Sequence, residues 1–199
     1  MATEWTRTQI EPAMKDTVWI RPLCADDLEQ LVAWDGNPAV AELMGQRFEG
    51  ADSARAWLLA MGPRRGRLGV AVMEGPRLMG DVELEHIVWR TGEAELRICL
   101  GNPAEWGRGL GTAAMHLVLA WAFGPLALRR VYLRVAVDNR RAVRLYEKCG
   151  FGKRAKLPST GRLRQARAVW LMELTAASYG GAAGRPRASA AGRGSTVLE

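Results

Sequence analysis

A glycine-rich stretch that runs directly into an apolar helix pattern is the first candidate for chemistry. Residues 105–112 read EWGRGLGT, which places glycine at Gly107, Gly109 and Gly111. Alternating glycines allow successive backbone N–H groups to converge on one point, and a helix start adds the positive end of its dipole there. Such a turn suits a phosphate-bearing ligand. A plain turn that only begins a helix explains the glycines equally well.

Two widespread phosphate-binding loops do not fit this stretch. A dinucleotide loop has the spacing G-x-G-x-x-G and an acidic residue about 20 positions later, whereas the spacing here is G-x-G-x-G and the later position is Val131. A nucleoside-triphosphate loop has lysine directly before its Ser or Thr, whereas Gly111 precedes Thr112. The sequence therefore excludes both loops.

A hairpin of two strands is the second candidate region, expected at 78–86 and 93–100 from their alternating residues. A slip of one residue would place a polar face against an apolar one, so the register is nearly fixed. The expected pairs are Val82 with Ile98, Leu84 with Leu96, Glu83 with Arg97, and Glu85 with Glu95.

The facing acids Glu85 and Glu95 could do proton chemistry on an amine. Two adjacent carboxylates resist losing both protons, so one of them can serve as a general base, and together they attract a cation. Glu95 is the first choice for that base and Glu85 the second. The alternative is that both acids are solvated and paired with Arg90 or Arg97, which would give them no catalytic role.

The elements that must position these residues alternate between strand and helix patterns. Strands are expected at 18–21, 68–73, 78–86, 93–100, 131–137, 151–157 and 167–174, and helices at 28–32, 40–44, 54–61, 109–123 and 142–149. The order strand, glycine loop, helix, strand predicts a βαβ unit with a parallel strand pair.

The break between the first two expected helices is an aromatic, polar loop that begins at Trp34 and Asp35. Such a loop is a candidate lid over a site, and it makes these two residues candidate substrate contacts. Packing of Trp34 in the core at a helix end is the commoner role for a residue of this kind.

A second motif follows the glycine loop at the distance of one helix and one strand. Residues 139–151 read NRRAVRLYEKCGF. The two motifs together resemble the GNAT superfamily of N-acetyltransferases, whose loop reads R/Q-x-x-G-x-G/A and whose next helix often reads N-x-x-A-x-x-L-Y-E-K-x-G-F. Trp106 stands where the general pattern has Arg or Gln. An aromatic residue there, with IRPL at 20–23 and Trp34, is similar to the branch related to ribosomal-protein N-terminal acetyltransferases.

The resemblance implies an α/β (α+β) GNAT fold over residues 18–175. Its sheet would be mixed and mostly antiparallel, splayed at the acetyl-CoA site and flanked by helices on both faces. Acetyl-CoA would be the co-substrate, and Tyr146 stands where the family often has its general acid. The implied acetyl-CoA contacts are Ile98, Leu100, Trp106, Gly107, Arg108, Gly109, Leu110, Gly111, Thr112 and Asn139. Residues 1–17 are expected to be a leader and residues 176–199 a disordered tail.

The expected function is transfer of an acetyl group to a primary amine of a small cationic molecule such as an aminoglycoside or a polyamine, because acids are expected at the cleft. Two alternatives stay open. One is acetylation of the amino terminus of a protein or peptide, which an open groove would favour. The other is a non-catalytic module that senses acyl-CoA or scaffolds a partner. A homodimer is also compatible with the resemblance.

Composition narrows the function further. The net charge of +7 comes from 28 Lys and Arg against 21 Asp and Glu, but the basic residues are scattered and lack the aromatic pattern of a nucleic-acid surface. The spacing of Cys24, Cys99, Cys149, His86 and His116 forms no metal motif. No apolar run approaches the roughly 18 residues of a membrane span, and no signal-like run begins the chain, so a cytoplasmic protein is expected.

Overall fold

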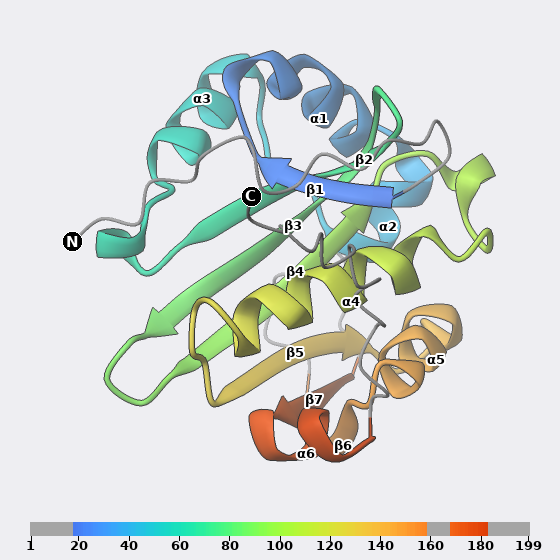
Figure 1. The fold of residues 1–199 in the computed structure, drawn as a ribbon. Helices are drawn as coiled ribbons and strands as arrows, with labels where there is room; N and C mark the ends of the chain where they lie inside the picture. Colours follow the sequence, from blue (N-terminus) through green and yellow to red (C-terminus); the bar gives the residue numbers. More distant parts are fainter. Residues whose placement is uncertain (1–17, 159–167, 183–199) are drawn as a thin grey trace, which may run out of the picture.

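The computed structural model describes residues 18–158 and 168–182 (Figure 1). A sheet in the order β1-β2-β3-β4-β5-β7-β6 forms its centre. The strands are β1 (Val18–Pro22), β2 (Leu68–Glu74), β3 (Arg77–Val88), β4 (Glu93–Leu100), β5 (Arg130–Ala136), β6 (Gly152–Leu157) and β7 (Val169–Thr175). The α-helices are α1 (Leu28–Asp35), α2 (Pro38–Met44), α3 (Ala51–Leu59), α4 (Leu110–Phe123), α5 (Arg140–Lys148) and α6 (Ala176–Ala182).

The β3–β4 hairpin has the register expected from its apolar faces. All four expected pairs are present, including Glu85 opposite Glu95. Val82 and Leu84 are each 1% exposed, so a slip of one residue would exchange buried apolar side chains for charged ones. The prediction of the register is confirmed.

The sheet opens between β4 and β5. These two strands pair in parallel, but only Glu93–Glu95 and Arg130–Tyr132 take part. Beyond that point β4 stays paired with β3 and β5 with β7, so the two strands diverge. The parallel pair, the splay and the mostly antiparallel sheet confirm the expected fold.

Helices cover both faces of the sheet. Helix α4, which lies in front of the sheet in Figure 1, buries Met115, Val118 and Leu119 in the core with Val82 and Leu84 of β3. A second core, built from Leu28, Leu31, Phe48 and Ala54, forms on the side of α1 and α3.

A cluster of buried charges lies between this second core and the sheet. Arg47 lies in the segment after α2. Its Nη1 and Nη2 donate hydrogen bonds to the two carboxylate oxygens of Asp81, at 2.7 and 3.0 Å. Its Nη1 also lies 3.4 Å from Glu83, and its Nε lies 3.4 Å from Asp35. None of these four side chains is more than 5% exposed. Strand alternation predicts that this polar face of β3 is exposed to solvent. It is buried here, because Arg47 neutralises the acids of β3.

The C-terminal boundary differs from the expectation. The tail was expected to begin at 176, but α6 occupies Ala176–Ala182 and its Tyr179 ring lies 5.1 Å from the Phe123 ring of α4. An aromatic contact with a distant helix can order a segment whose own composition carries no helix signal. The leader at 1–17 and the rest of the tail lie outside the described residues.

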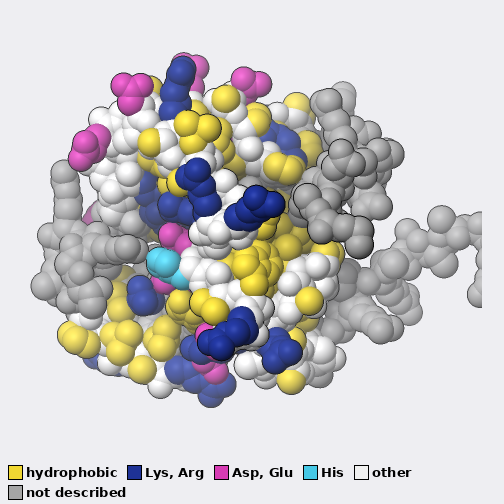
Figure 2. Space-filling view, turned by 90° about the vertical axis from the view of Figure 1, so that its left-hand side faces the viewer, with side chains coloured by type: hydrophobic (Ala, Val, Ile, Leu, Met, Phe, Trp, Pro, Cys, Tyr) yellow, Lys and Arg dark blue, Asp and Glu magenta, His cyan; other side chains and the backbone are white. Residues whose placement is uncertain are grey.

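Charged side chains are dispersed on the face of the molecule drawn in Figure 2. Figure 2 shows Lys and Arg side chains distributed over one face, with hydrophobic surface and uncharged atoms between them. Over residues 18–158 and 168–182, no helix is both long and apolar enough to cross a membrane.

Candidate active site

A cavity of about 740 Å³ occupies the opening between β4 and β5. Its walls come from the end of α2, the diverging strands, the glycine-rich loop and α5. Glu85, Glu95 and Tyr146 all line it, so the structure brings together the three residues expected to be catalytic. The expected acetyl-CoA contacts that line it are Ile98, Leu100, Trp106, Gly107, Gly109, Leu110, Gly111, Thr112 and Asn139.

The glycine-rich loop has a backbone that only glycine adopts readily. Gly107 and Gly109 have φ of +91° and +90°, in the left-handed region. Gly109 is the N-cap of α4, and the first N–H groups of a helix have no partner within it. The loop and the helix start therefore present backbone donors beside the cavity, as a phosphate-bearing ligand requires.

Trp106 links this loop to two other elements. Its indole N–H donates to the backbone carbonyl of Leu100 at 2.9 Å, at the end of β4. The Arg141 guanidinium of α5 lies 3.8 Å from the centre of the indole ring, a cation–π contact, and burial lowers the pKa of Arg141. Trp106 therefore holds the loop to β4 and α5.

Arg108 is the one expected acetyl-CoA contact that does not line the cavity. Its guanidinium turns outward and pairs with Glu74 at 3.0 Å and with Glu105. The glycines on either side let the backbone reverse its direction at this point. The expectation that Arg108 touches acetyl-CoA is therefore not supported by its orientation.

Three basic residues on α5 supply positive charge that sequence reasoning missed. Arg141, Arg144 and Lys148 line the cavity. Their spacing of i, i+3 and i+7 places them on one face of the helix, and this spacing is visible in the sequence. Together with the loop donors they fit the phosphates of acetyl-CoA.

Asn139 and Tyr146 hold their positions through α5. Asn139 Oδ1 accepts a hydrogen bond from the Ala142 N–H at 3.1 Å and caps the helix, which leaves its amide N–H groups for a ligand. Tyr146 is 7% exposed and packs edge-on against Phe151. Burial raises the pKa of Tyr146, so its phenol keeps its proton at neutral pH.

The two facing acids have different partners. Glu95 Oε1 lies 3.4 Å from Arg134, and its Oε2 lies 3.1 Å from His86 Nδ1. Glu85 Oε2 lies 3.3 Å from Arg67. The alternative pairing with Arg90 or Arg97 is not what the structure shows.

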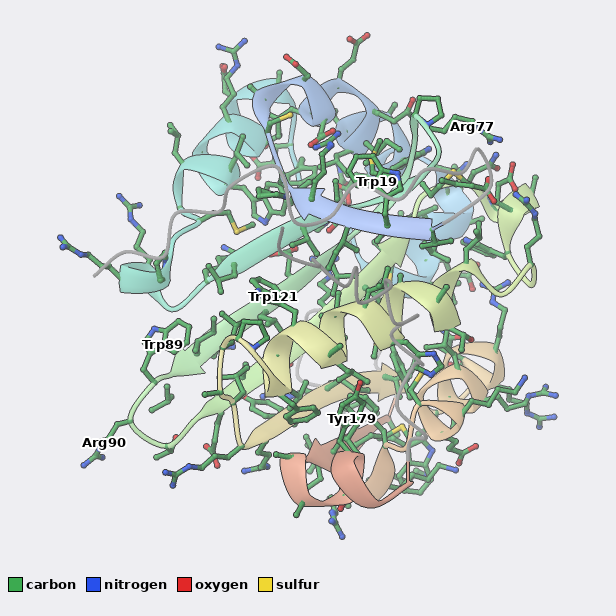
Figure 3. All side chains as sticks on the ribbon, viewed as in Figure 1. Trp19, Arg77, Trp89, Arg90, Trp121 and Tyr179 are labelled. Atoms are coloured by element: carbon green, nitrogen blue, oxygen red, sulfur yellow. The ribbon has the colours of Figure 1, made fainter. Side chains whose placement is uncertain are left out.

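Arg90 and Arg97 both point away from Glu85 and Glu95. Arg90 projects from the tip of the β3–β4 hairpin, away from the body of the protein (Figure 3). Arg97 donates to the backbone carbonyl of Met44 at 3.2 Å and lies 3.9 Å from Glu83. Glu85 and Glu95 therefore face the cavity without an ion pair to either residue.

His86 joins the site through a β-bulge, which the sequence pattern did not reveal. The register of β3 and β4 shifts after Glu85, and His86 has φ of +51°, which is uncommon for a residue with a side chain. The extra residue allows both Leu84 and Ile87 to lie in the core. It turns His86 out of the alternation and toward Glu95.

Trp34 and Asp35 do not line the cavity. Trp34 packs against Gly101, where any side chain would overlap the indole. Asp35 is 3% exposed, and its Oδ2 accepts the backbone N–H groups of Arg47 at 2.7 Å and Phe48 at 2.9 Å. The expectation that these residues contact substrate is corrected, because both hold α1 in place.

Metal ions in proteins are held by clustered His, Cys, Asp and Glu side chains. Within residues 18–158 and 168–182, no three His, Cys, Asp or Glu side chains are arranged to hold an ion.

Comparison with known proteins decides the family. Residues 17–152 match the sequence profile described as "Acetyltransferase (GNAT) domain". The chain belongs to the GNAT acetyltransferase family. The splayed sheet, the glycine-rich loop before α4 and the cavity between β4 and β5 are thus features of a GNAT domain in this chain.

Several relatives of this GNAT chain have spermidine acetyltransferase names. The spermidine N(1)-acetyltransferase of Escherichia coli K12 is 30% identical over 148 residues, covering 71% of this chain and 76% of that protein. The Vibrio cholerae spermidine N(1)-acetyltransferase is 33% identical over 100 residues, and the match spans 48% of this chain and only 57% of that relative. A crystal structure of the Vibrio cholerae spermidine N-acetyltransferase in complex with CoA and spermine has a TM-score of 0.74 at 25% identity, over 81% of this chain and 97% of that chain.

Proposed function

We propose that this GNAT domain transfers the acetyl group of acetyl-CoA to a primary amine of a polyamine-like small cation. The facing pair Glu85 and Glu95 on the cavity wall carries the proposal, since two carboxylates beside the cofactor cleft attract a cationic amine and can take its proton. The relatives that act on spermidine support the same class of acceptor.

Acetyl-CoA fits the donor groups of the cavity. The loop residues that line the cavity, at 106–107 and 109–112, and the basic face of α5 would hold its phosphates, and Asn139 and the edge of β4 at Ile98 would hold the arm. When bound, acetyl-CoA supplies the acetyl thioester. The β4 edge has no β5 partner beyond Glu95, so its backbone donors are free to bind a ligand and to stabilise an oxyanion.

The protein residues then divide the proton transfers. A primary amine is protonated at neutral pH, and only its free lone pair can attack a thioester. Glu95 takes the proton from the ammonium group, and the cavity holds the two reactants together. Tyr146, which burial keeps protonated, donates its proton to the departing thiolate and regains a proton when the nitrogen of the tetrahedral intermediate loses its second proton.

A thiol-release assay with acetyl-CoA and a panel of amines tests this proposal. The panel contains spermidine, spermine, an aminoglycoside and short peptides with free amino termini. The highest kcat/KM is expected for the polyamines. A preference for the peptides would instead support a protein amino terminus as the acceptor. This is the main alternative, because Trp106 and residues 20–23 resemble the branch related to ribosomal-protein N-terminal acetyltransferases. Tight binding of acetyl-CoA without turnover of any amine would support a sensor.

A further inference from the structure

The proposed reaction releases one net proton in each turnover. An ammonium group enters with three protons on nitrogen and leaves as an amide with one, and one of the two lost protons ends on the thiol of CoA. The other proton must reach solvent from the residue that removed it. The question is which side chain provides that route.

Glu95 has little direct contact with solvent. Its side chain is 11% exposed, and its Oε1 faces Arg134, whose guanidinium has no lone pair to accept a proton. Its Oε2 faces His86 Nδ1 at 3.1 Å. His86 is 54% exposed, so its ring spans from the enclosed carboxylate to the surface.

Glu85 lacks such a neighbour. Its Oε2 contacts Arg67 at 3.3 Å, and arginine cannot carry a proton away at physiological pH. A β-bulge and an uncommon backbone conformation at His86 turn the histidine toward Glu95 and not along the normal alternation of β3.

We propose that His86 is a proton relay that carries the substrate proton from Glu95 to solvent. This inference rests on the proposed function of the site. Bond changes balance in two steps. The Glu95 O–H bond breaks as the His86 Nδ1–H bond forms, and the Nε2–H bond then breaks as that proton passes to water or buffer. His86 returns to its neutral form with its tautomer exchanged, and exposure to solvent allows the tautomers to interconvert.

The relay works among several charged and titratable groups. Glu85 lies on β3 beside it, and Arg67 reaches Glu85 from the start of β2. From β5, Arg134 contacts Glu95, and Tyr132 lies close enough for Glu95 to raise the pKa of its phenol, after burial as the larger cause. Of these groups in the described structure, His86 is the one in direct contact with Glu95 whose side chain has two ring nitrogens, so that it can accept a proton on one nitrogen and release a proton from the other.

Replacement of His86 tests the relay with spermidine and acetyl-CoA. His86→Gln keeps a hydrogen-bonding group beside Glu95 but cannot shuttle a proton, so kcat should fall roughly 10- to 100-fold with the KM for acetyl-CoA unchanged. The deficit should shrink as pH rises toward the amine pKa of about 10, where the substrate arrives without its extra proton. His86→Ala should recover activity when imidazole is added. His116→Gln, at an exposed position on α4, is the control.

Three results would overturn the relay. The first is a His86→Gln variant with the wild-type kcat, which would leave His86 with an orienting role only. The second is a deficit that is constant with pH and is not rescued by imidazole. The third is a wild-type protein that acetylates no amine, which contradicts the proposed function and removes the reaction that the relay would serve.

Discussion

Tyr146 shows how a residue combines a structural and a chemical requirement. Its ring packs against Phe151 in the core while the residue lines the cavity. A sequence motif can mark such a tyrosine, but only the fold shows that it reaches the same cavity as Glu95. No sequence motif marks His86. Its position beside Glu95 depends on a β-bulge that the alternation of residues in the sequence does not predict.

Tyr146→Phe should reduce kcat about 100-fold, because the phenol that donates the proton is removed while the ring packing remains. Burial raises the pKa of Tyr146, so in the wild type ionisation of this phenol should cause no loss of activity up to about pH 10. Steady-state rates from pH 6 to 10 measure both effects. Tyr179→Phe is the matched control, since this tyrosine packs on Phe123 outside the cavity. Equal rates for Tyr146→Phe and wild type would remove Tyr146 from proton transfer.

The glycine-rich loop and its neighbours show what can be predicted for an element. Spacing of glycines predicted the helix start, and matching of apolar faces predicted the β3–β4 register. The direction of Arg108 and the stacking of Arg141 on Trp106 could not be predicted, because both depend on which elements lie beside the loop. The same holds for Trp34 and Asp35, whose partners come from distant segments.

Trp106→Phe should weaken acetyl-CoA binding several-fold. Phenylalanine keeps a ring beneath Arg141 but removes the N–H that bonds to the Leu100 carbonyl, a net loss of about 1 kcal/mol. Trp106→Ala should weaken binding further, since the cation–π contact is lost as well. Calorimetric titration with CoA measures both. Trp89→Phe is the control. The Trp89 indole lies on the exposed tip of the β3–β4 hairpin, and it donates a hydrogen bond to the backbone carbonyl of Pro63. Unchanged affinity in Trp106→Ala would show that the indole does not organise the loop.

The charge cluster around Arg47 shows what the whole molecule adds. It joins the end of α1, the segment after α2 and two positions of β3, which are far apart in the sequence. Burial opposes the charge of Arg47, but its contacts with Asp81 outweigh this and raise the pKa of Arg47. Burial also raises the pKa of Glu83, and Asp81 adds to this effect. Strand alternation alone treats these acids as exposed, so the cluster could not be predicted.

Arg47→Met should lower the free energy of unfolding by about 3–5 kcal/mol, because the buried acids Asp35 and Asp81 lose the cation that neutralises them, whereas Glu83 keeps its ion pair with Arg67. Urea unfolding at neutral pH measures the change. Arg55→Met, at an exposed position of α3, is the control and should change stability by less than about 0.5 kcal/mol. A loss in Arg47→Met no larger than in the control would mean that the cluster does not stabilise the fold.

The central claim is that Glu95, at the splayed cavity, removes the proton of a polyamine-like substrate. The most direct test is the kcat of Glu95→Gln with spermidine and acetyl-CoA, compared with Glu85→Gln. A loss of about 10²–10⁴-fold is expected for Glu95→Gln and a smaller one for Glu85→Gln, because only Glu95 contacts a histidine. A Glu95→Gln variant with the wild-type kcat and an unchanged acidic limb of the pH–rate profile would contradict the claim.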